Sequence, residues 1–295
     1  MYARKPEWLK LKYTETSHSE VSLLMKRYSL NTVCREANCP NLGECYKKGT
    51  ATFMILGSRC TRNCPFCNVE SGCPLAPDPA EPEHVAQAVE KLHLKYSVIT
   101  SVTRDDLPDE GAAHFAQTIR AIKSLCPDVK VEVLIPDMHA KPELLDIVLG
   151  AKPDVLNHNM ETVERLYGTV RPQAKYRRSL DVLRYAKKTY AAITKTGIMV
   201  GLGETEDEVF KLMDDVLDTG CDILTIGQYL RPTPNHIAVA ELYKENLKNI
   251  KKRECKKASA TLQARPLCAV LTTPPKRFYA AAYDLHRSRQ YRPLF

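Results

Sequence analysis

Short apolar runs with the character of buried strands alternate with longer amphipathic stretches, and this alternation constrains the fold more than any other feature of the sequence. The strand-like runs cover residues 52–56, 96–101, 130–135, 155–159, 196–200 and 223–226, and the helical patterns cover 82–94, 111–125, 142–149, 178–189 and 205–219. Repeated strand–helix units predict a parallel sheet covered by helices. We therefore expect an α/β fold, most simply a partial (β/α)6 TIM-type barrel, with a doubly wound open sheet as the alternative.

Polar residues or glycines follow each predicted strand, whereas the strands themselves are apolar. The carboxyl ends of parallel barrel strands meet at one face, and that face carries the chemistry. We therefore expect a site built from Gly57-Ser-Arg-Cys60, Val102-Thr-Arg-Asp-Asp106, Pro136-Asp137, Asn157-His-Asn159, Gly201-Leu-Gly-Glu204 and Gln228-Tyr229. Taken singly, Asp137 or Glu204 could equally be a turn residue or a helix cap. The glycines of 201–205 predict a close approach of the backbone to a ligand, and His158 is a possible pocket residue.

The cysteines are concentrated near the amino terminus, where six of the eleven form two triplets. The first triplet, with the spacing C-x4-C-x5-C, is Cys34, Cys39 and Cys45, and the second, with the spacing C-x3-C-x2-C, is Cys60, Cys64 and Cys67. Zinc sites usually present pairs of ligands, whereas three close thiolates suit a cubane iron–sulfur cluster with one iron left open. The second triplet therefore favours a cluster over a zinc knuckle. The first fits either kind of site when taken alone, and its position directly before the second favours another cluster.

The net charge of +8 is a property of the carboxyl-terminal tail. Residues 241–295 hold 13 Lys or Arg and four Asp or Glu, so residues 1–240 hold 30 basic and 31 acidic side chains. A near-neutral body does not predict a nucleic-acid-binding protein. The sequence also has neither an apolar run of about 18 residues nor a recognisable targeting peptide at its start. We therefore expect a cytoplasmic protein that binds no nucleic acid and no membrane, and there the cysteines predict metal binding rather than disulfides.

A C-x3-C-x2-C loop after the first strand of a partial barrel resembles the radical S-adenosylmethionine (radical SAM) enzymes. The chain is more specifically similar to the lipoyl synthase family, from Arg4-Lys-Pro-Glu-Trp-Leu-Lys10 to about Tyr229. The motifs that carry this resemblance are Cys34-Arg-Glu-Ala-Asn-Cys-Pro-Asn-Leu-Gly-Glu-Cys45, Ile99-Thr-Ser-Val-Thr-Arg-Asp-Asp-Leu-Pro108, Val131-Glu-Val-Leu-Ile-Pro-Asp137, Asn157-His-Asn-Met-Glu-Thr162 and Leu224-Thr-Ile-Gly-Gln-Tyr229.

The resemblance implies two [4Fe-4S] clusters and S-adenosyl-L-methionine as cofactors. Cys60, Cys64 and Cys67 would hold the cluster whose open iron binds S-adenosylmethionine, which is cleaved to a 5′-deoxyadenosyl radical. That radical would abstract hydrogens from C6 and C8 of an octanoyl chain. Cys34, Cys39 and Cys45 would hold an auxiliary cluster that donates the two sulfurs. The candidate pocket residues, for cofactor or substrate, are Phe66, Thr103, Asn159, Glu161 and Arg171.

The partners implied are an octanoylated lipoyl carrier domain or H protein and an electron donor. Two other functions stay open from the sequence: a radical SAM enzyme with an auxiliary cluster that acts on another substrate, and an inactive scaffold that binds carrier domains. The expected organisation is an amino-terminal extension with the auxiliary ligands (1–50), the barrel (51–240) and a basic tail (241–295).

The tail departs from the family pattern. The family's auxiliary cluster has a serine ligand in a carboxyl-terminal Arg-Ser-Ser-Tyr motif, and this chain has only Arg287-Ser-Arg-Gln-Tyr291. Codons that encode Cys268-Ala-Val-Leu-Thr-Thr-Pro274 can encode Arg-Ser-Ser-Tyr-His-Ala when they are read two bases later. We therefore hypothesise a shifted reading frame from about residue 257, and we expect the residues after it to lack a packed structure.

Overall fold

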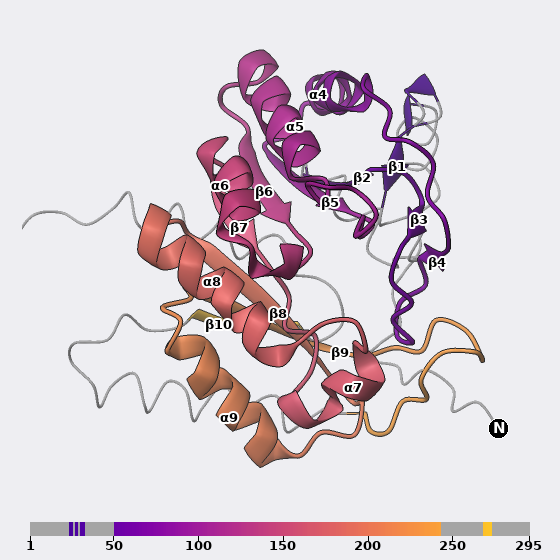
Figure 1. Cartoon of the computed structure of the whole chain (residues 1–295), viewed down its shortest axis with the longest axis vertical. Coiled ribbons are helices and arrows are strands. Elements are labelled where there is room, and N and C mark those ends of the chain that lie inside the picture. Colours follow the sequence, from indigo (N-terminus) through magenta and orange to yellow (C-terminus); the bar gives the residue numbers. More distant parts are fainter. Residues whose placement is uncertain (1–23, 26, 29, 33–49, 243–267, 273–295) are drawn as a thin grey trace, which may run out of the picture.

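A computed structural model describes residues 24–25, 27–28, 30–32, 50–242 and 268–272, and its centre is an eight-stranded sheet (Figure 1). All strand pairings in this sheet are parallel except that between the first two strands. The strands, in their order across the sheet, are β1 (Asn31–Thr32), β2 (Thr50–Ile55), β5 (Tyr96–Ser101), β6 (Lys130–Leu134), β7 (Val155–Asn157), β8 (Thr194–Val200), β9 (Ile223–Gln228) and β10 (Cys268–Thr272).

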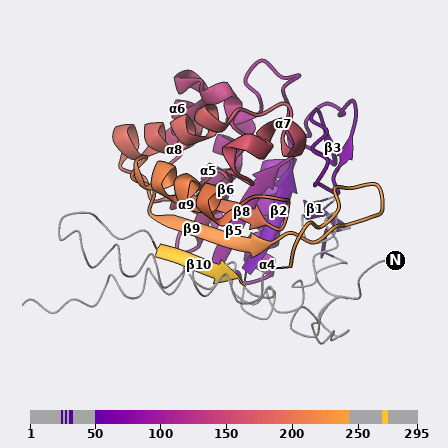
Figure 2. The ribbon, with the colours of Figure 1, turned by 90° about the horizontal axis from the view of Figure 1, so that it is seen from below.

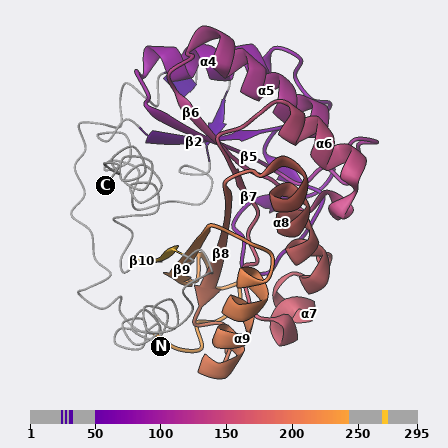
Figure 3. The ribbon, with the colours of Figure 1, turned by 90° about the vertical axis from the view of Figure 1, so that its left-hand side faces the viewer.

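The order of the strands identifies the sheet as a partial barrel. From β2 to β10 the strands of this sheet lie side by side in the order in which they occur in the sequence, with no point at which the order reverses; β3 and β4 form a separate pair. A doubly wound sheet would have such a reversal, so that alternative is wrong. Figure 3 shows the helices in an arc along one side of the curved sheet, as in a barrel left open between its first and last strands.

The helices connect successive strands and cover the outer side of the sheet (Figures 1 and 3). They are α4 (Glu81–Lys91), α5 (Ala112–Leu125), α6 (Pro142–Gly150), α7 (Tyr167–Val170), α8 (Tyr176–Tyr190) and α9 (Glu206–Leu217), with short 3-10 helices η3 (Met138–Ala140) and η4 (Glu164–Leu166). The start of α9 illustrates how the sequence sets a boundary. Thr205 and Glu208 form a capping box there, in which each side chain bonds the other residue's backbone.

Both kinds of element form where the sequence predicts them. The predicted strand 96–101 coincides with β5, and each of the other five overlaps its observed strand closely. β5 is buried on both faces because the barrel interior lies on one side and helices lie on the other. Successive residues of β5, the hydroxyl-bearing Ser97 and Thr100 included, are therefore buried without alternation, and the same holds for β9.

The barrel interior also contains a buried ion pair. Lys195 of β8 donates to both carboxylate oxygens of Glu132 of β6, at 2.9 and 3.1 Å. Tyr96 of β5 donates its hydroxyl to Glu132 Oε2 at 2.6 Å, and Asn157 of β7 donates to Oε1 at 2.9 Å. These contacts join four adjacent strands through one carboxylate, and the charged groups themselves are 1–2% exposed.

One expectation about the tail is wrong for five residues. β10, formed by Cys268–Thr272, pairs in parallel with Ile223–Gly227 of β9 (Figure 2), although we expected no packed structure after about residue 257. An open strand edge offers unpaired N–H and C=O groups, and a run of apolar and β-branched residues is suited to pair with it. The rest of the tail after 242 lies outside the described residues, as do Cys34, Cys39 and Cys45. In the described part of the chain, no helix has the length and apolar character needed to cross a bilayer.

Candidate active site

The loop that follows β2, residues 57–67, carries the C-x3-C-x2-C motif and is called the cluster loop below. Gly57 has a φ of 96°, a left-handed conformation that favours glycine, and it turns the chain out of the sheet. Cys60 lies in β3 (Arg59–Cys60), which pairs with β4 (Glu70–Ser71). The Cys67 N–H donates to the Cys64 carbonyl oxygen at 2.9 Å, and all three cysteine side chains are half-buried.

The three thiols of the cluster loop lie close enough to act on one another. The pKa of Cys64 is raised to about 11, mainly by burial; the charge of Arg171 opposes this rise, and the charges of Cys67 and Cys60 add to it. Burial also raises the pKa of Cys67. A cationic centre bound between these sulfurs would relieve their repulsion and stabilise the thiolates. The loop therefore fits a cluster that takes three protein ligands and leaves one iron open.

Arg62, within the motif, joins the cluster loop to the carboxyl ends of β5 and β6. Its Nε and Nη2 donate to the two oxygens of Asp105 at 2.7 and 2.8 Å, and Nη2 also donates to Asp137 Oδ1 at 2.8 Å. The second oxygen of Asp137 accepts from Arg178 Nε of α8 at 2.8 Å. Burial opposes ionisation of Asp137, but the two arginines prevail and hold the pKa of its carboxyl well below the usual range.

Sequence reasoning did not select Arg62. The sequence did contain an indication of this role: an arginine lies between two predicted metal ligands, and aspartates follow the next two predicted strands. Asp137 also accepts a bond from the His139 N–H at the start of η3, so the helix-cap interpretation of this residue is confirmed as well.

Thr103, a predicted pocket residue, follows β5 and contacts the cluster loop through its backbone. Its N–H donates to Cys60 Sγ at 3.3 Å, and its carbonyl oxygen accepts from both the N–H and the hydroxyl of Thr61, at 3.0 Å each. The Thr61 hydroxyl in turn accepts from the Asp105 N–H at 3.1 Å. Four hydrogen bonds thus connect this strand end to the first residues of the motif.

Three other predicted pocket residues lie together after β7. Asn159 Nδ2 donates to Glu161 Oε1 at 3.0 Å, and Arg171 Nη1 donates to the Asn159 carbonyl oxygen at 2.8 Å. Burial raises the pKa of Glu161, and Arg171 opposes this rise. Val170, the residue before Arg171, belongs to the buried group against which Phe66 of the cluster loop packs, so these residues lie beside that loop. The charge of Arg171 accordingly lowers the pKa of Cys64, and that of Glu161 raises it.

The fifth predicted residue, Phe66, has an apolar environment. It packs against a small buried group formed by Val170, Leu202 and Tyr229. The structure thus places Phe66 inside the cluster loop and anchors that loop to the neighbouring barrel elements.

His158 presents an unpaired acceptor in the same region. Its Nδ1 bonds the Ile135 carbonyl oxygen at 2.9 Å, so Nδ1 carries the proton and Nε2 carries a lone pair. Burial lowers the pKa of His158 to about 4, so the ring is neutral at pH 7. Nε2 is buried and has no hydrogen-bond partner among the described residues. A buried acceptor without a donor is costly, and a ligand that brings an N–H or O–H group would satisfy it.

The glycines of 201–205 were predicted to let the backbone approach a ligand, and at Gly201 the close approach that the structure shows is to the chain itself, to the Gln228 side chain and the Glu241 carbonyl. Gly201 has a φ of 101°, and a Cβ at this position would lie 2.5 Å from the Glu241 carbonyl oxygen. The Ala240 N–H also donates to the Gly201 carbonyl at 2.8 Å. Glu204 accepts from the Leu202 N–H at 2.9 Å and from the Gly201 N–H, which confirms it as a turn residue.

The segment after β9 covers the cluster loop, and sequence reasoning did not predict this contact. Figure 1 shows its orange trace running beside the chain between β3 and β4. His236 Nε2 donates to the Cys67 carbonyl oxygen at 3.0 Å, and the Ile237 N–H donates to the Pro65 carbonyl at 3.2 Å. The prolines of Arg231-Pro-Thr-Pro-Asn-His236 predict a loop but give no indication of its target.

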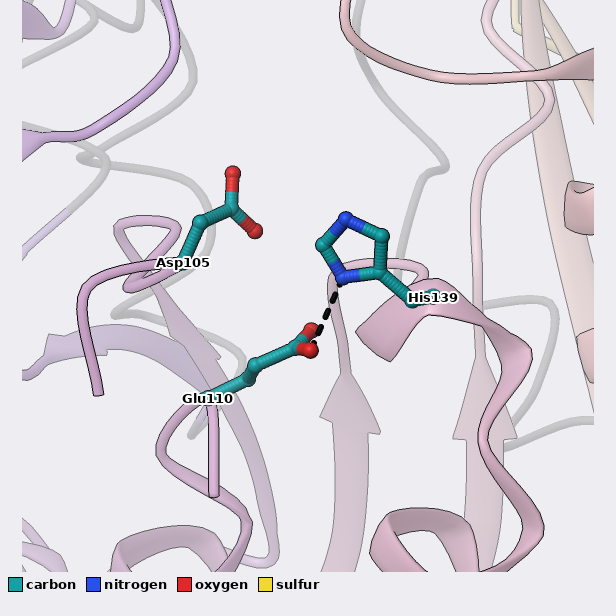
Figure 4. Close-up of side chains that lie close together, drawn as sticks. All are labelled: Asp105, Glu110 and His139. Atoms are coloured by element: carbon teal, nitrogen blue, oxygen red, sulfur yellow. Dashed lines mark hydrogen bonds and ion pairs between the residues drawn. The ribbon is translucent and has the colours of Figure 1, made fainter. Parts of the chain in front are cut away.

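A second group of potential metal ligands lies beside this site. Asp105, Glu110 and His139 each place a ligand atom within 4.8 Å of the others (Figure 4). Both carboxylates already have cationic or hydrogen-bonding partners. Glu110 Oε1 lies 2.8 Å from His139 Nδ1 and accepts from Lys141 Nζ at 2.9 Å, while Arg62 occupies Asp105. These contacts account for the group as a salt-bridge cluster at the ends of β5 and β6.

Comparison with known proteins identifies the relatives of this chain. The Radical SAM superfamily profile matches residues 54–216. A lipoyl synthase of Caldanaerobacter subterraneus subsp. tengcongensis is 56% identical over 242 residues, which cover 82% of this chain and 85% of the relative. A lipoyl synthase of Bacteroides fragilis is 50% identical over 271 residues, which cover 90% of this chain and 92% of the relative.

Solved structures share the fold at much lower identity. Methylornithine synthase superimposes with a TM-score of 0.58 at 14% identity, covering 92% of this chain and 82% of that one. Streptococcus suis SuiB bound to S-adenosylmethionine gives a TM-score of 0.58 at 13% identity, covering 87% of this chain and 61% of that one. These similarities establish the fold alone.

Proposed function

Because the chain belongs to the lipoyl synthase family of the radical SAM superfamily, we propose that the cluster loop and the strand ends beside it form its active site. The enzyme is a sulfurtransferase that inserts two sulfurs at C6 and C8 of a protein-bound octanoyl chain. The observation that carries the assignment of the site is the convergence of Cys60, Cys64 and Cys67 with residues from the ends of β5, β6 and β7.

Cys60, Cys64 and Cys67 would hold a [4Fe-4S] cluster with one open iron for S-adenosylmethionine. When bound, these two cofactors supply the radical that removes hydrogen from an unactivated carbon. The protein's contribution is then to bind, to orient and to exclude water. Phe66 packs against Val170, Leu202 and Tyr229, and His236 bonds the Cys67 carbonyl, so both contacts hold the cluster loop in place against the barrel.

The residues after β7 are suited to bind S-adenosylmethionine. This molecule carries an ammonium, a carboxylate and a sulfonium, so it needs charged partners of both signs. Glu161 offers a carboxylate beside Cys64, and Arg171 orders the loop by donating to the Asn159 carbonyl. His158 Nε2 offers the acceptor that an amine or hydroxyl of the ligand would complete. Thr103 contributes through its N–H to Cys60.

A second, auxiliary cluster is proposed for Cys34, Cys39 and Cys45, which would supply the two sulfurs. These cysteines precede β2 in the sequence, in the amino-terminal extension expected for residues 1–50. The fourth ligand would be the serine encoded in the alternative frame of the tail. Resequencing the end of the coding region tests that point, and an unshifted frame without the Arg-Ser-Ser-Tyr motif would rule it out.

The substrate is an octanoyl chain on a lipoyl carrier domain or H protein, and an electron donor must reduce the cofactors. The cytoplasmic location stays a prediction. The sequence left two alternatives open: a radical SAM enzyme with another substrate and an inactive carrier-binding scaffold. Neither is favoured, since identity to lipoyl synthases reaches 56% over most of the chain.

The number of iron atoms per chain tests the cofactor assignment. After anaerobic reconstitution we expect about eight irons with equal sulfide, because each of two clusters holds about four. Replacing Cys34, Cys39 and Cys45 with alanine together should reduce the count to about four and leave reductive cleavage of S-adenosylmethionine in place. A wild-type count of about four, unchanged in the triple variant, would contradict the auxiliary cluster. Zinc without iron would contradict both clusters.

A further inference from the structure

We propose that Arg62 is a positioning residue for the cluster: by pairing with Asp105 and Asp137 it holds the Thr103 N–H on Cys60 Sγ. The inference rests on the proposed function, because it assumes that Cys60 is a cluster ligand. In this role Arg62 influences the reduction potential of the cluster and the rate at which the protein loses the cluster's iron.

The position of Arg62 gives it control of the cluster loop. It lies between the first two cysteines of the motif, and its side chain is only 5% exposed. Its guanidinium reaches two different strand ends, Asp105 after β5 and Asp137 after β6, with three hydrogen bonds of 2.7–2.8 Å. A planar guanidinium held by two carboxylates has a fixed orientation, and so does the backbone that carries it.

The pairing of Arg62 with Asp105 also positions the Thr103 N–H that donates to the Cys60 sulfur. Thr103 is two residues before Asp105, and the Asp105 N–H bonds the Thr61 hydroxyl at 3.1 Å. The pairing of Arg62 with Asp105 therefore keeps residues 103–105 against residues 60–62. Within that contact the Thr103 N–H reaches Cys60 Sγ at 3.3 Å.

A hydrogen bond to a ligating sulfur withdraws charge from it, which raises the reduction potential of an iron–sulfur cluster. Loosening the segment would weaken this bond and leave more charge on the sulfur. It would also make the loop a less rigid frame for the metal. Both consequences concern the cluster rather than the stability of the barrel.

Arg178→Gln is a matched control for Arg62→Gln. Both arginines pair with Asp137, so either variant leaves this buried carboxylate with one arginine. Only Arg62 belongs to the cluster loop, whereas Arg178 belongs to α8. A general effect of weakening Asp137 should therefore appear in both variants, and an effect on the loop should appear in Arg62→Gln alone.

The experiment uses full-length reconstituted protein and measures two quantities. These are the rate of iron loss to a chelator and the midpoint potential of the cluster whose electron paramagnetic resonance signal changes when S-adenosylmethionine is added. In Arg62→Gln we expect iron loss about 10-fold faster and a more negative potential. Arg62→Lys, which can pair with one aspartate but not both, should recover part of each change. Asp105→Asn should shift both quantities in the same direction as Arg62→Gln.

The outcomes separate this inference from the proposed function. If wild-type protein binds no cluster at the cluster loop, the proposed function fails. If it does bind one, and Arg62→Gln matches Arg178→Gln in both quantities, Arg62 is only a structural ion-pair partner and the inference is wrong. If Arg62→Gln does not fold, Arg62→Lys and Asp105→Asn decide: wild-type potential and iron loss in both would overturn the proposal.

Discussion

Replacing Cys64 with alanine is expected to remove about four irons per chain and to abolish cleavage of S-adenosylmethionine and sulfur insertion. Two thiolates cannot hold the cubane firmly, and without this cluster S-adenosylmethionine receives no electron for its cleavage. Iron and sulfide analysis, with 5′-deoxyadenosine measured by chromatography, gives both results. Cys73→Ala is the control, because this exposed cysteine lies six residues beyond the motif. Cleavage activity that survived in Cys64→Ala would show that the cluster loop does not hold the cluster.

The second large effect is expected in the barrel interior. Lys195→Met leaves the buried Glu132 carboxylate without its ion-pair partner among the described residues, and both side chains are at most 2% exposed. Removing one partner of a buried pair typically costs about 3–5 kcal/mol. We therefore expect the free energy of unfolding, measured by chemical denaturation, to fall by about that amount.

A double variant and a surface variant make this prediction specific. Glu132→Gln added to Lys195→Met removes the uncompensated charge and keeps an acceptor for Tyr96 and Asn157, so more than half of the loss should return. Lys211→Met, at an exposed pair with Glu164, should cost less than about 1 kcal/mol. Equal losses in Lys195→Met and Lys211→Met would mean that burial of the pair has no energetic consequence.

The strands could be predicted from the sequence because burial on both faces produces short apolar runs, and the helices because one buried face produces an amphipathic pattern. The run that became β5 has no competing local signal, and the boundary of α9 is marked by its own capping residues, Thr205 and Glu208. The doubly wound alternative could not be excluded from the sequence, because the order of strands depends on contacts between distant segments. β10 was missed for the same reason, as its pairing depends on the open edge of β9.

The candidate site was predictable only where residue type and spacing carried the chemistry. The C-x3-C-x2-C motif predicts metal binding by itself, and Asn159 and Glu161 lie at and just beyond the end of the predicted strand 155–159. Arg62 and His236 were missed because each acts on a partner far away in the sequence. Arg62 bonds Asp137, 75 residues on, and His236 bonds the Cys67 carbonyl across 169 residues. Contacts of this kind have no local pattern.

The positions of the charged residues are more informative than the net charge of the whole chain. The surplus of +8 comes from residues 241–295, while residues 1–240 taken together are near neutral. The described part of the chain therefore builds its site from paired charges, such as Arg62 with Asp105, and not from an excess of one sign.

The most direct measurement of the central claim is the mass of an octanoyl-lysine carrier domain incubated with reconstituted protein, reductant and S-adenosylmethionine. Enzyme of the lipoyl synthase family should add two sulfur atoms and remove two hydrogens, at C6 and C8, with two molecules of 5′-deoxyadenosine formed for each product. A carrier domain of unchanged mass, recovered while S-adenosylmethionine is cleaved and both clusters are present, would contradict the account.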